Sequence, residues 1–306
     1  MARRLSTFTP RSILCAVDFS AQSATALRHA AAMAKRSRGR ITVLFVNDPL
    51  LTAAAAAAYN PRALTRATLR ELRSFVRRSL PSRGAPSIRY LVALGKPARE
   101  ILKTAARLRS DLVVVGTEGL GGARKLFFGS TTEQLLRQAN RPVLAVPKSG
   151  RPRIKTPARD WPGPCLVAPN DLGGAADADA AQAGEVARAF GADLILVHVI
   201  PTVQAPPWSR ADLGAHYRMA IATAQERLDA LRSTVGNDVT TECRIAVGNP
   251  ADEIAALAAA RRTGLVVLTL RGRGGLLGSR PGAIAYHVLT HRVAPVLALP
   301  PKQRAR

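Results

Sequence analysis

The sequence predicts an α/β fold of two tandem doubly wound open sheets, each with five mainly parallel strands. Three observations lead to this prediction. Short apolar runs rich in Val, Ile and Leu alternate with longer helical patterns along the chain. The apolar runs are nearly continuous, as expected of parallel strands that helices cover on both faces. The chain also repeats itself at a constant interval, so each half carries the same succession of elements.

Each half contains five apolar runs, and strand–helix alternation of this kind implies right-handed βαβ units. Helical patterns lie between the runs, for example Ser23–Arg38, Ala98–Arg109 and Ala251–Arg262. The predicted strands are Ile13–Val17, Ile41–Val46, Ile88–Ala93, Leu112–Gly116 and Val143–Val146 in the first half, and Leu166–Pro169, Leu194–Val199, Thr241–Ala246, Leu265–Leu270 and Val296–Leu299 in the second.

The internal repeat appears when the sequence is shifted by 153 residues, the interval from Asp18 to Asp171. The same shift superimposes glycines, prolines and the segments before the last strands. We therefore predict two homologous domains, residues 1–150 and 160–301, with a Pro- and Arg-rich connector at about 148–164. The matching positions are Gly95-Lys-Pro97 with Gly248-Asn-Pro250, Gly119 with Gly272, Gly129 with Gly282, and Arg141–Pro147 with Ala294–Pro300.

The composition narrows the class of protein. Hydrophobic residues make up 47% and charged residues 21%, which is typical of globular proteins and argues against a disordered chain. The three cysteines, Cys15, Cys165 and Cys243, are far apart, so a disulfide framework is not expected and a reducing compartment fits best. No segment approaches the roughly 18 apolar residues of a membrane span. We expect a cytoplasmic protein.

Glycines with the spacing G-x2-G-x9-G-S follow the fourth predicted strand, at Gly116, Gly119 and Gly129-Ser130. A strand end without side chains lets backbone N–H groups approach a phosphate chain. The segment from Ser130 to Glu133 has the S-x-x-E form of a capping box, and a helix start offers unpaired N–H donors that suit a phosphate. In an open α/β sheet this place lies at the carboxyl ends of the strands, where ligands bind.

With these motifs the sequence resembles the universal stress protein family, over nearly the whole chain as two tandem copies. The resemblance rests on Val17-Asp18-Phe19-Ser20, on the glycine pattern, and on Arg141-Pro142-Val143. It implies a Rossmann-like fold of the adenine nucleotide alpha-hydrolase type and a member that binds ATP, with or without Mg²⁺. The ATP-binding residues that it implies are Val17 and Asp18 at the adenine–ribose end, Val46 through its backbone at adenine, and Gly116, Gly119, Gly129, Ser130 and Thr131 at ribose and phosphates. Arg124, between the glycines, is placed to meet phosphates.

The second half departs from the pattern. Thr269 stands where Gly116 stands, and Ala283 replaces Ser130 and removes a hydroxyl and the expected cap. We therefore expect a degenerate second site, weak or empty, at Asp171, Thr269, Gly272, Gly282 and Ala283.

The two halves differ in charge. Of the net charge of +25, about +21 lies in residues 1–153 and about +4 in residues 154–306. The interpretations that stay open are an anionic partner such as nucleic acid or a membrane surface, long-range attraction of ATP itself, or a solvated helix face in an arginine-biased genome. Five arginines spaced four, four, three and four apart form one helical stripe: Arg62, Arg66, Arg70, Arg73 and Arg77.

These features favour an ATP-binding regulatory protein of the stress response over a turnover enzyme, because no general base, nucleophile–base pair or metal-ligand cluster accompanies the glycines. A Walker motif is absent, so a strong Mg-ATPase is not predicted, while slow ATP hydrolysis stays open. The alternatives are a nucleotidyl or phosphoryl transfer enzyme on the same scaffold and a basic nucleic-acid-binding protein. His287 and His291 are four residues apart, but no third ligand completes a metal site.

For the assembly, the family resemblance implies that last strands pair edge to edge. Val143–Val146 would then pair with Val296–Leu299 inside one chain and cover exposed sheet edges. Whether two chains also form a homodimer is left open by the sequence.

Overall fold

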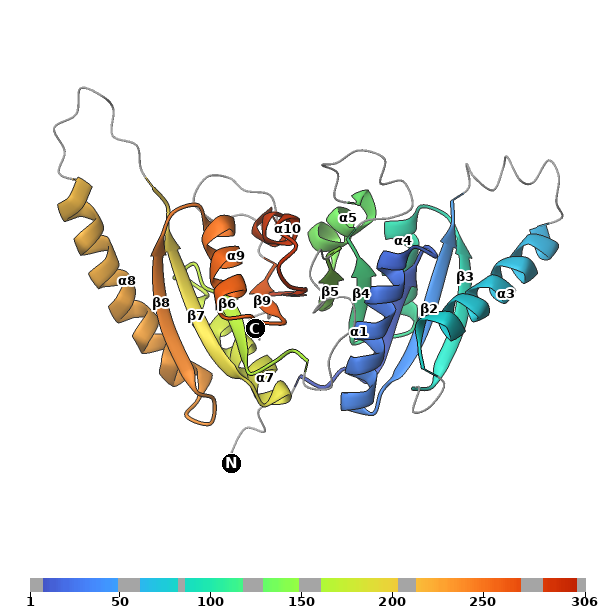
Figure 1. The fold of residues 1–306 in the computed structure, drawn as a ribbon, viewed down its shortest axis with the longest axis horizontal. Helices are drawn as coiled ribbons and strands as arrows, with labels where there is room; N and C mark the ends of the chain where they lie inside the picture. Colours follow the sequence, from blue (N-terminus) through green and yellow to red (C-terminus); the bar gives the residue numbers. More distant parts are fainter. Residues whose placement is uncertain are drawn as a thin grey trace, which may run out of the picture. The chain divides into compact units, whose positions relative to one another are not determined.

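The computed structural model describes residues 8–48, 61–81, 86–117, 129–148, 161–202, 213–270 and 283–301 of the 306. The chain forms two compact units. We call Thr9–Trp161 together with Pro295–Pro300 the N-terminal unit, and Pro162–Ala294 the C-terminal unit. In each unit strands and helices alternate along the chain (Figure 1). This arrangement confirms the predicted α/β fold class.

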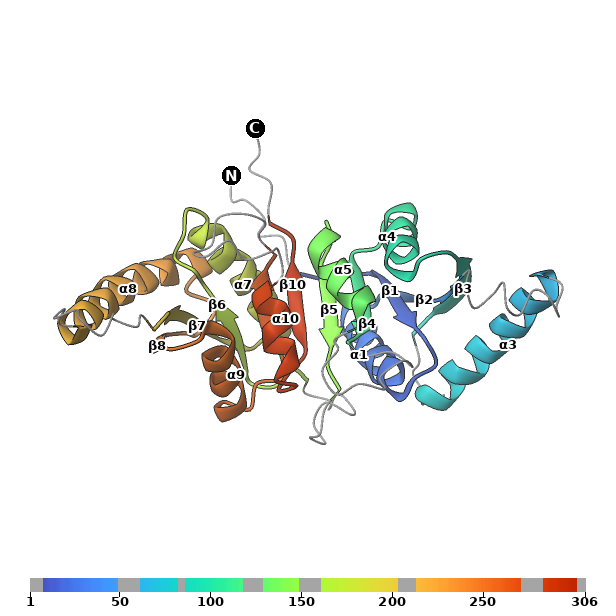
Figure 2. The same cartoon turned by 90° about the horizontal axis from the view of Figure 1, so that it is seen from above.

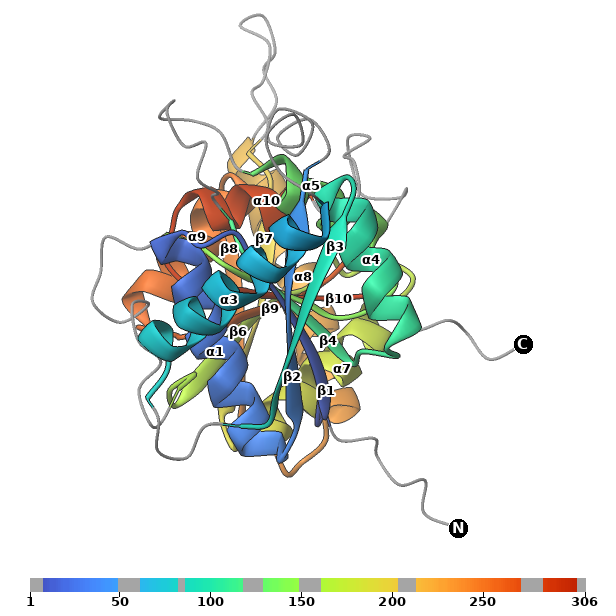
Figure 3. The ribbon, with the colours of Figure 1, turned by 90° about the vertical axis from the view of Figure 1, so that its right-hand side faces the viewer.

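The N-terminal unit is a sheet with helices on both faces. Its described elements are β1 (Ser12–Val17), α1 (Ala21–Ser37), β2 (Arg40–Asn47), α3 (Pro61–Ser79), β3 (Ile88–Leu94), α4 (Pro97–Arg107), β4 (Leu112–Gly116), α5 (Ser130–Gln138), β5 (Val143–Val146) and β10 (Val296–Leu299). The strand order is β3-β2-β1-β4-β5-β10. Figures 2 and 3 show α1 and α3 on one face of the strands and α4 on the other, and in Figure 2 α5 lies on the same face as α4.

The C-terminal unit repeats this plan. Its described elements are β6 (Cys165–Pro169), α7 (Ala176–Phe190), β7 (Asp193–Ile200), α8 (Leu213–Val235), β8 (Thr241–Val247), α9 (Pro250–Ala260), β9 (Val266–Thr269) and α10 (Ala283–Thr290). The strand order is β9-β6-β7-β8, and all pairs are parallel. The helices α7 and α8 pack beside each other, as do α9 and α10.

The strand β10 comes from the end of the chain but belongs to the N-terminal unit. It pairs antiparallel with β5, so that Val296 lies opposite Ala145 and Leu297 opposite Leu144. This confirms the predicted pairing of the two last strands inside one chain. The pairing covers the edge of β5, which would otherwise present unpaired N–H and carbonyl groups.

A row of apolar residues crosses five neighbouring strands of the N-terminal unit at its centre. The row consists of Val43, Cys15, Val114, Leu144 and Leu297, which lie opposite one another in the register, and none of them is exposed to solvent. The central strands therefore have the continuous burial that the apolar runs predict. The outer strands β3 and β8 are only half-buried along most of their length.

The internal repeat also appears in backbone conformation, because unusual positive φ angles recur at the same interval of 153 residues. Such angles are uncommon for residues other than glycine, so their recurrence is independent support for the repeat. The matching pairs are Phe19 (64°) with Leu172 (55°), Gly95 (146°) with Gly248 (158°), and Arg109 (50°) with Arg262 (52°).

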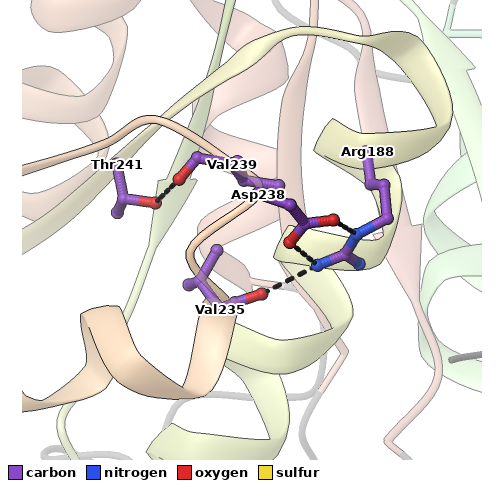
Figure 4. A network of polar contacts seen from close by, with 5 residues as sticks. All are labelled: Arg188, Val235, Asp238, Val239 and Thr241. Atoms are coloured by element: carbon purple, nitrogen blue, oxygen red, sulfur yellow. Dashed lines mark hydrogen bonds and ion pairs between the residues drawn. The ribbon is translucent and has the colours of Figure 1, made fainter.

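A bidentate ion pair ties α7 to the turn between α8 and β8 (Figure 4). Both carboxylate oxygens of Asp238 accept hydrogen bonds from Arg188, which also donates from Nη2 to the carbonyl of Val235 at 3.0 Å. The Arg188 guanidinium lowers the pKa of the Asp238 carboxyl group below its usual value. Thr241 begins β8 with a hydrogen bond to the carbonyl of Val239 at 3.0 Å. These contacts fix the entry into β8.

All three cysteines are free thiols; Cys15 is buried, and Cys165 and Cys243 are half-buried. Within the described part of the chain, no helix combines the length and the apolar character that crossing a membrane would require.

Candidate functional site

The strand order of the N-terminal unit has one point at which the chain changes direction across the sheet. From β1 the chain proceeds outward to β2 and β3, and then returns to place β4 on the other side of β1. The gap between the carboxyl ends of β1 and β4 is the topological switch point, where open α/β sheets bind ligands. Val17 ends β1 and Gly116 ends β4, so two segments of the predicted site lie at this point.

The turn that follows β1 is organised by Asp18. Its Oδ1 accepts hydrogen bonds from the backbone N–H of Ser20 at 3.1 Å and from the Ser20 hydroxyl at 2.6 Å. Ser20 is the N-cap of α1, where its Oγ accepts from the N–H of Ser23 at 3.1 Å. Asp18 is half-buried. The carboxylate thus has a local structural role, which is compatible with the ligand contact that the family resemblance implies.

Phe19 lies next to Asp18 in a left-handed conformation, with φ of 64°. Its ring stacks on Phe45 of β2 at 4.3 Å between centroids and meets the edge of Phe75 of α3 at 5.6 Å. The packing of three aromatic rings offsets the cost of this backbone conformation, which is about 1–2 kcal/mol. No sequence pattern predicted this cluster, although it unites three of only seven phenylalanines in the chain.

Gly116, at the end of β4, lies close to a residue of α1. A Cβ on Gly116 would lie 2.8 Å from Cγ of Gln22, a residue of α1. Gln22 in turn donates from Nε2 to the carbonyl of Val146 at 3.0 Å. The missing side chain is therefore explained by the close approach of α1 to the end of β4. The room for a phosphate chain that we expected at Gly116 stays a prediction, because the contact with Gln22 does not exclude it.

The start of α5 also differs from the prediction. The N-cap is Gly129 and not Ser130, and no side chain caps this helix end. Ser130 is the first helical residue and is exposed, so the predicted capping box is wrong by one position. Glu133 forms an ion pair with Arg137 instead. The N–H of Gly129 donates to the carbonyl of Thr117 at 2.7 Å, which holds the helix start beside the end of β4.

A further residue that the sequence analysis did not single out, Thr132, ties α5 to β4. Its buried hydroxyl donates to the carbonyl of Gly116 at 2.8 Å. Because this contact and that of Gly129 converge on residues 116–117, the N-terminus of α5 lies beside the end of β4 at the switch point. The sequence carried a signal for this contact. Thr132 is a polar residue in the first turn of α5, on the side of the helix that faces the sheet.

The other predicted residues of this site are placed as follows. Val46 lies near the end of β2, opposite Ala93 of β3, and is half-buried. Thr131 follows Ser130 in the first turn of α5 and is also half-buried. Gly119 and Arg124 lie outside the described residues, and so do Gly272 and Gly282 of the second half.

The matching place in the C-terminal unit has the same turn but other side chains. Asp171 Oδ1 accepts from the N–H of Gly173 at 2.8 Å, just as Asp18 accepts from Ser20. Thr269 ends β9, and its Oγ1 lies 3.5 Å from Oε1 of Gln182 in α7. The threonine side chain is thus directed at α7, and the degenerate second site stays a prediction. Ala283 is the first residue of α10, so it replaces Ser130 without removing a cap.

Arg141 of the third family motif lies at the opposite end of the sheet from the switch point. Its Nη1 donates to the carbonyl of Ser110, which precedes β4, at 3.0 Å. This contact joins the beginnings of β4 and β5 and has no part in the candidate site.

His198 and His291 each lie beside a polar group. Among the described residues, no group of three or more His, Cys, Asp or Glu side chains is arranged to hold a metal ion. His291 lies just after α10, and its Nε2 is 3.0 Å from Oδ1 of Asp252 in α9. His198 is half-buried, with Nδ1 2.8 Å from the carbonyl of Asn170.

Comparisons with known proteins agree with the fold and with the repeat. A universal stress protein of Mycolicibacterium smegmatis is 27% identical over 96% of this chain and 98% of its own length. A universal stress protein of Mycobacterium tuberculosis is 26% identical over 94% of this chain and 95% of its own length.

Solved structures with similar folds span both units. A functionally unknown protein of Pseudomonas aeruginosa has a TM-score of 0.63 and 19% identity, with 96% of this chain and 94% of its own covered. A universal stress protein of Archaeoglobus fulgidus has a TM-score of 0.61 and 18% identity, with 96% and 98% covered. The model of the universal stress protein family matches residues 10–147 and again residues 166–300. The chain belongs to the universal stress protein family, with two tandem copies of the family's domain.

Proposed function

We propose that this universal stress protein binds ATP at the switch point of the N-terminal unit and acts as a regulatory protein rather than as a turnover enzyme. The observation that carries the proposal is the convergence of two groups at the carboxyl ends of β1 and β4. One is the half-buried carboxylate of Asp18, and the other is the N-terminus of α5. A carboxylate accepts hydrogen bonds from ribose hydroxyls, and a helix N-terminus donates them to phosphates.

The contacts at the start of α5 make this donor set suitable for a phosphate chain. Gly129 has no side chain that could compete for the free N–H groups, and no side-chain cap satisfies them. The exposed Ser130 and half-buried Thr131 add hydroxyl donors beside them. In this proposal Val17, Val46, Gly116, Gly119 and Arg124 complete the site as the family resemblance implies.

The second part of the proposal is that the two copies bind ATP unequally. Ala283 lacks the hydroxyl of Ser130, and Asn170, directly after β6, stands where Val17 ends β1. His198 replaces Phe45, so the aromatic cluster is also missing from the C-terminal unit. These differences support one strong site in each chain.

Ser130→Asp tests the phosphate end of the site. An aspartate in the first turn favours the helix by about 0.3–1 kcal/mol, whereas its charge repels a triphosphate. We expect this variant to keep its thermal stability and to bind ATP at least about tenfold more weakly. Gln134→Glu, which adds the same charge one turn later on the exposed side of α5, is the matched control and keeps most of the affinity.

Mass spectrometry of nucleotide released from freshly purified protein gives the ligand directly. We expect adenine nucleotide from the wild type and the Gln134→Glu control, and much less from Ser130→Asp. Equal amounts from all three proteins would contradict the proposed site. Steady-state ATP turnover well above about 1 per second would contradict the non-enzymatic part of the proposal.

A further inference from the structure

The arginine stripe lies on α3, as the sequence predicts, and all five of its members are exposed: Arg62, Arg66, Arg70, Arg73 and Arg77. The helix carries a single acid, Glu71, whose Oε1 pairs with Nη2 of Arg78 at 2.7 Å. Arg78 is not a member of the stripe. The one negative charge of α3 is therefore paired without involving any of the five stripe arginines. The stripe spans about 22 Å at 1.5 Å per residue.

The apolar face of α3 is already occupied. Leu72, Phe75 and Val76 form the inner side of the helix, and with Leu80, which follows its last residue, they are each less than 9% exposed. Among the described residues of α3, no large apolar side chain is exposed. A helix of this kind has no free apolar face for insertion into a lipid surface, so its outer side offers charge and hydrogen-bond donors only.

The corresponding helix of the repeat, α8, shows that the fold does not require the stripe. Buried Leu72, Phe75 and Ser79 of α3 match buried Leu228, Leu231 and Val235 of α8, at the same spacing along the helix and three residues beyond the general interval of 153. In this register the stripe positions of α8 are all exposed, as in α3, yet they carry one cation and two anions. The residues there are Arg218, Ala222, Glu226, Asp229 and Ser233.

Arg73 is held in place by an aromatic neighbour. Its guanidinium carbon lies 5.5 Å from the ring centroid of Tyr90, which belongs to the adjoining strand β3. A cation–π contact of this geometry restricts the side chain while its N–H groups remain available to an anion. Part of the stripe is therefore preorganised.

We propose that the exposed side of α3 binds double-helical nucleic acid through its phosphates, without reading the base sequence. Guanidinium groups match phosphate oxygens in a bidentate geometry, and a single line of cations suits a linear polyanion of high charge density. The alternative of single strands fits less well, because only 4% of the residues are aromatic and the exposed side of α3 offers no ring for base stacking. None of the five arginines of the stripe belongs to the nucleotide site proposed above.

Fluorescence anisotropy with a mixed-sequence DNA duplex, measured over a range of NaCl concentrations, tests the proposal on the full chain. Five phosphate contacts predict a slope of log affinity against log salt of about −4 to −5. The variant Arg66→Ala/Arg70→Ala/Arg77→Ala should make this slope less steep by about 3. It should also weaken binding at least about tenfold at 100 mM NaCl.

The matched control is Arg99→Ala/Lys103→Ala/Arg107→Ala, which removes three exposed basic residues from α4 with the same loss of charge. It should keep the wild-type slope to within about 1. Equal losses in both triple variants would overturn the proposal, because net charge alone would then explain binding. It would also be overturned if the wild type did not bind the duplex, or if the stripe variant lost affinity for phosphatidylserine vesicles but not for DNA.

Discussion

Gln22 and Gly116 are packed so closely that a side chain at Gly116 would collide with the glutamine. A Cβ on Gly116 would lie 2.8 Å from Cγ of Gln22 and 3.4 Å from its backbone carbonyl carbon. The amide of Gln22 also donates to the carbonyl of Val146, so the side chain cannot move away without losing a buried hydrogen bond. The glycine lets α1 approach the carboxyl ends of β4 and β5.

Gly116→Ala should therefore lower the free energy of unfolding, by about 1–3 kcal/mol, because the added methyl group overpacks this contact. Urea denaturation measures the change. In the double variant Gly116→Ala/Gln22→Ala, the cost of the first substitution should fall by about 1 kcal/mol, since Cγ of Gln22 is then absent. If Gly116→Ala kept full stability and lost ATP binding, the glycine would serve the ligand instead of the helix.

Phe19 provides a second test, in which glycine should be tolerated better than alanine. Both substitutions remove the rings' contacts with Phe45 and Phe75, but only glycine relieves the positive φ angle. Phe19→Gly should thus be about 1 kcal/mol more stable than Phe19→Ala. The same order is expected for Leu172 in the C-terminal unit. Alanine variants as stable as the glycine variants would show that these backbone conformations carry no strain.

His29 makes stability depend on pH. It is fully buried in α1 against Trp161, Nδ1 donates to the carbonyl of Thr25 at 2.9 Å, and Nε2 has no hydrogen-bond partner among the described residues. Burial lowers the pKa of His29 to about 4. In the unfolded chain the pKa of a histidine is near 6.5. Between pH 4 and pH 6.5, His29 therefore binds more protons in the unfolded chain than in the folded protein.

The free energy of unfolding should therefore fall as the pH drops from about 6.5 to about 4, by about 3 kcal/mol in total. His29→Leu removes the titrating group, so its stability should change less over this range. Chemical denaturation of both proteins at several pH values provides the measurement. Parallel curves for the two proteins would rule out His29 as the source.

Much of this fold follows from the sequence because parallel strands buried on both faces leave an unambiguous apolar pattern. The predicted Leu112–Gly116, Val143–Val146 and Val296–Leu299 match the structure at both ends, and the other strands agree to within a few residues. The pairing of β5 with β10 followed from the resemblance to the family and not from the apolar pattern.

The local geometry of the candidate site was less predictable. The motif Ser130–Glu133 has the composition of a capping box, but Gly129 supplies the cap because Gly129 and Thr132 fix the helix start to β4. The partner of Gly116 is 94 residues away in the sequence, and no local pattern reveals such a contact. Contacts between distant segments decide both features.

The most direct test of the central claim is calorimetric titration of the full chain with ATP, for the wild type, Ser130→Asp and Ala283→Asp. The two variants place the same charge at matching positions of the repeat, at the starts of α5 and α10. We expect one strong site per chain, lost only in Ser130→Asp. Two equal sites, a loss caused by Ala283→Asp, or no binding at millimolar ATP would contradict the claim.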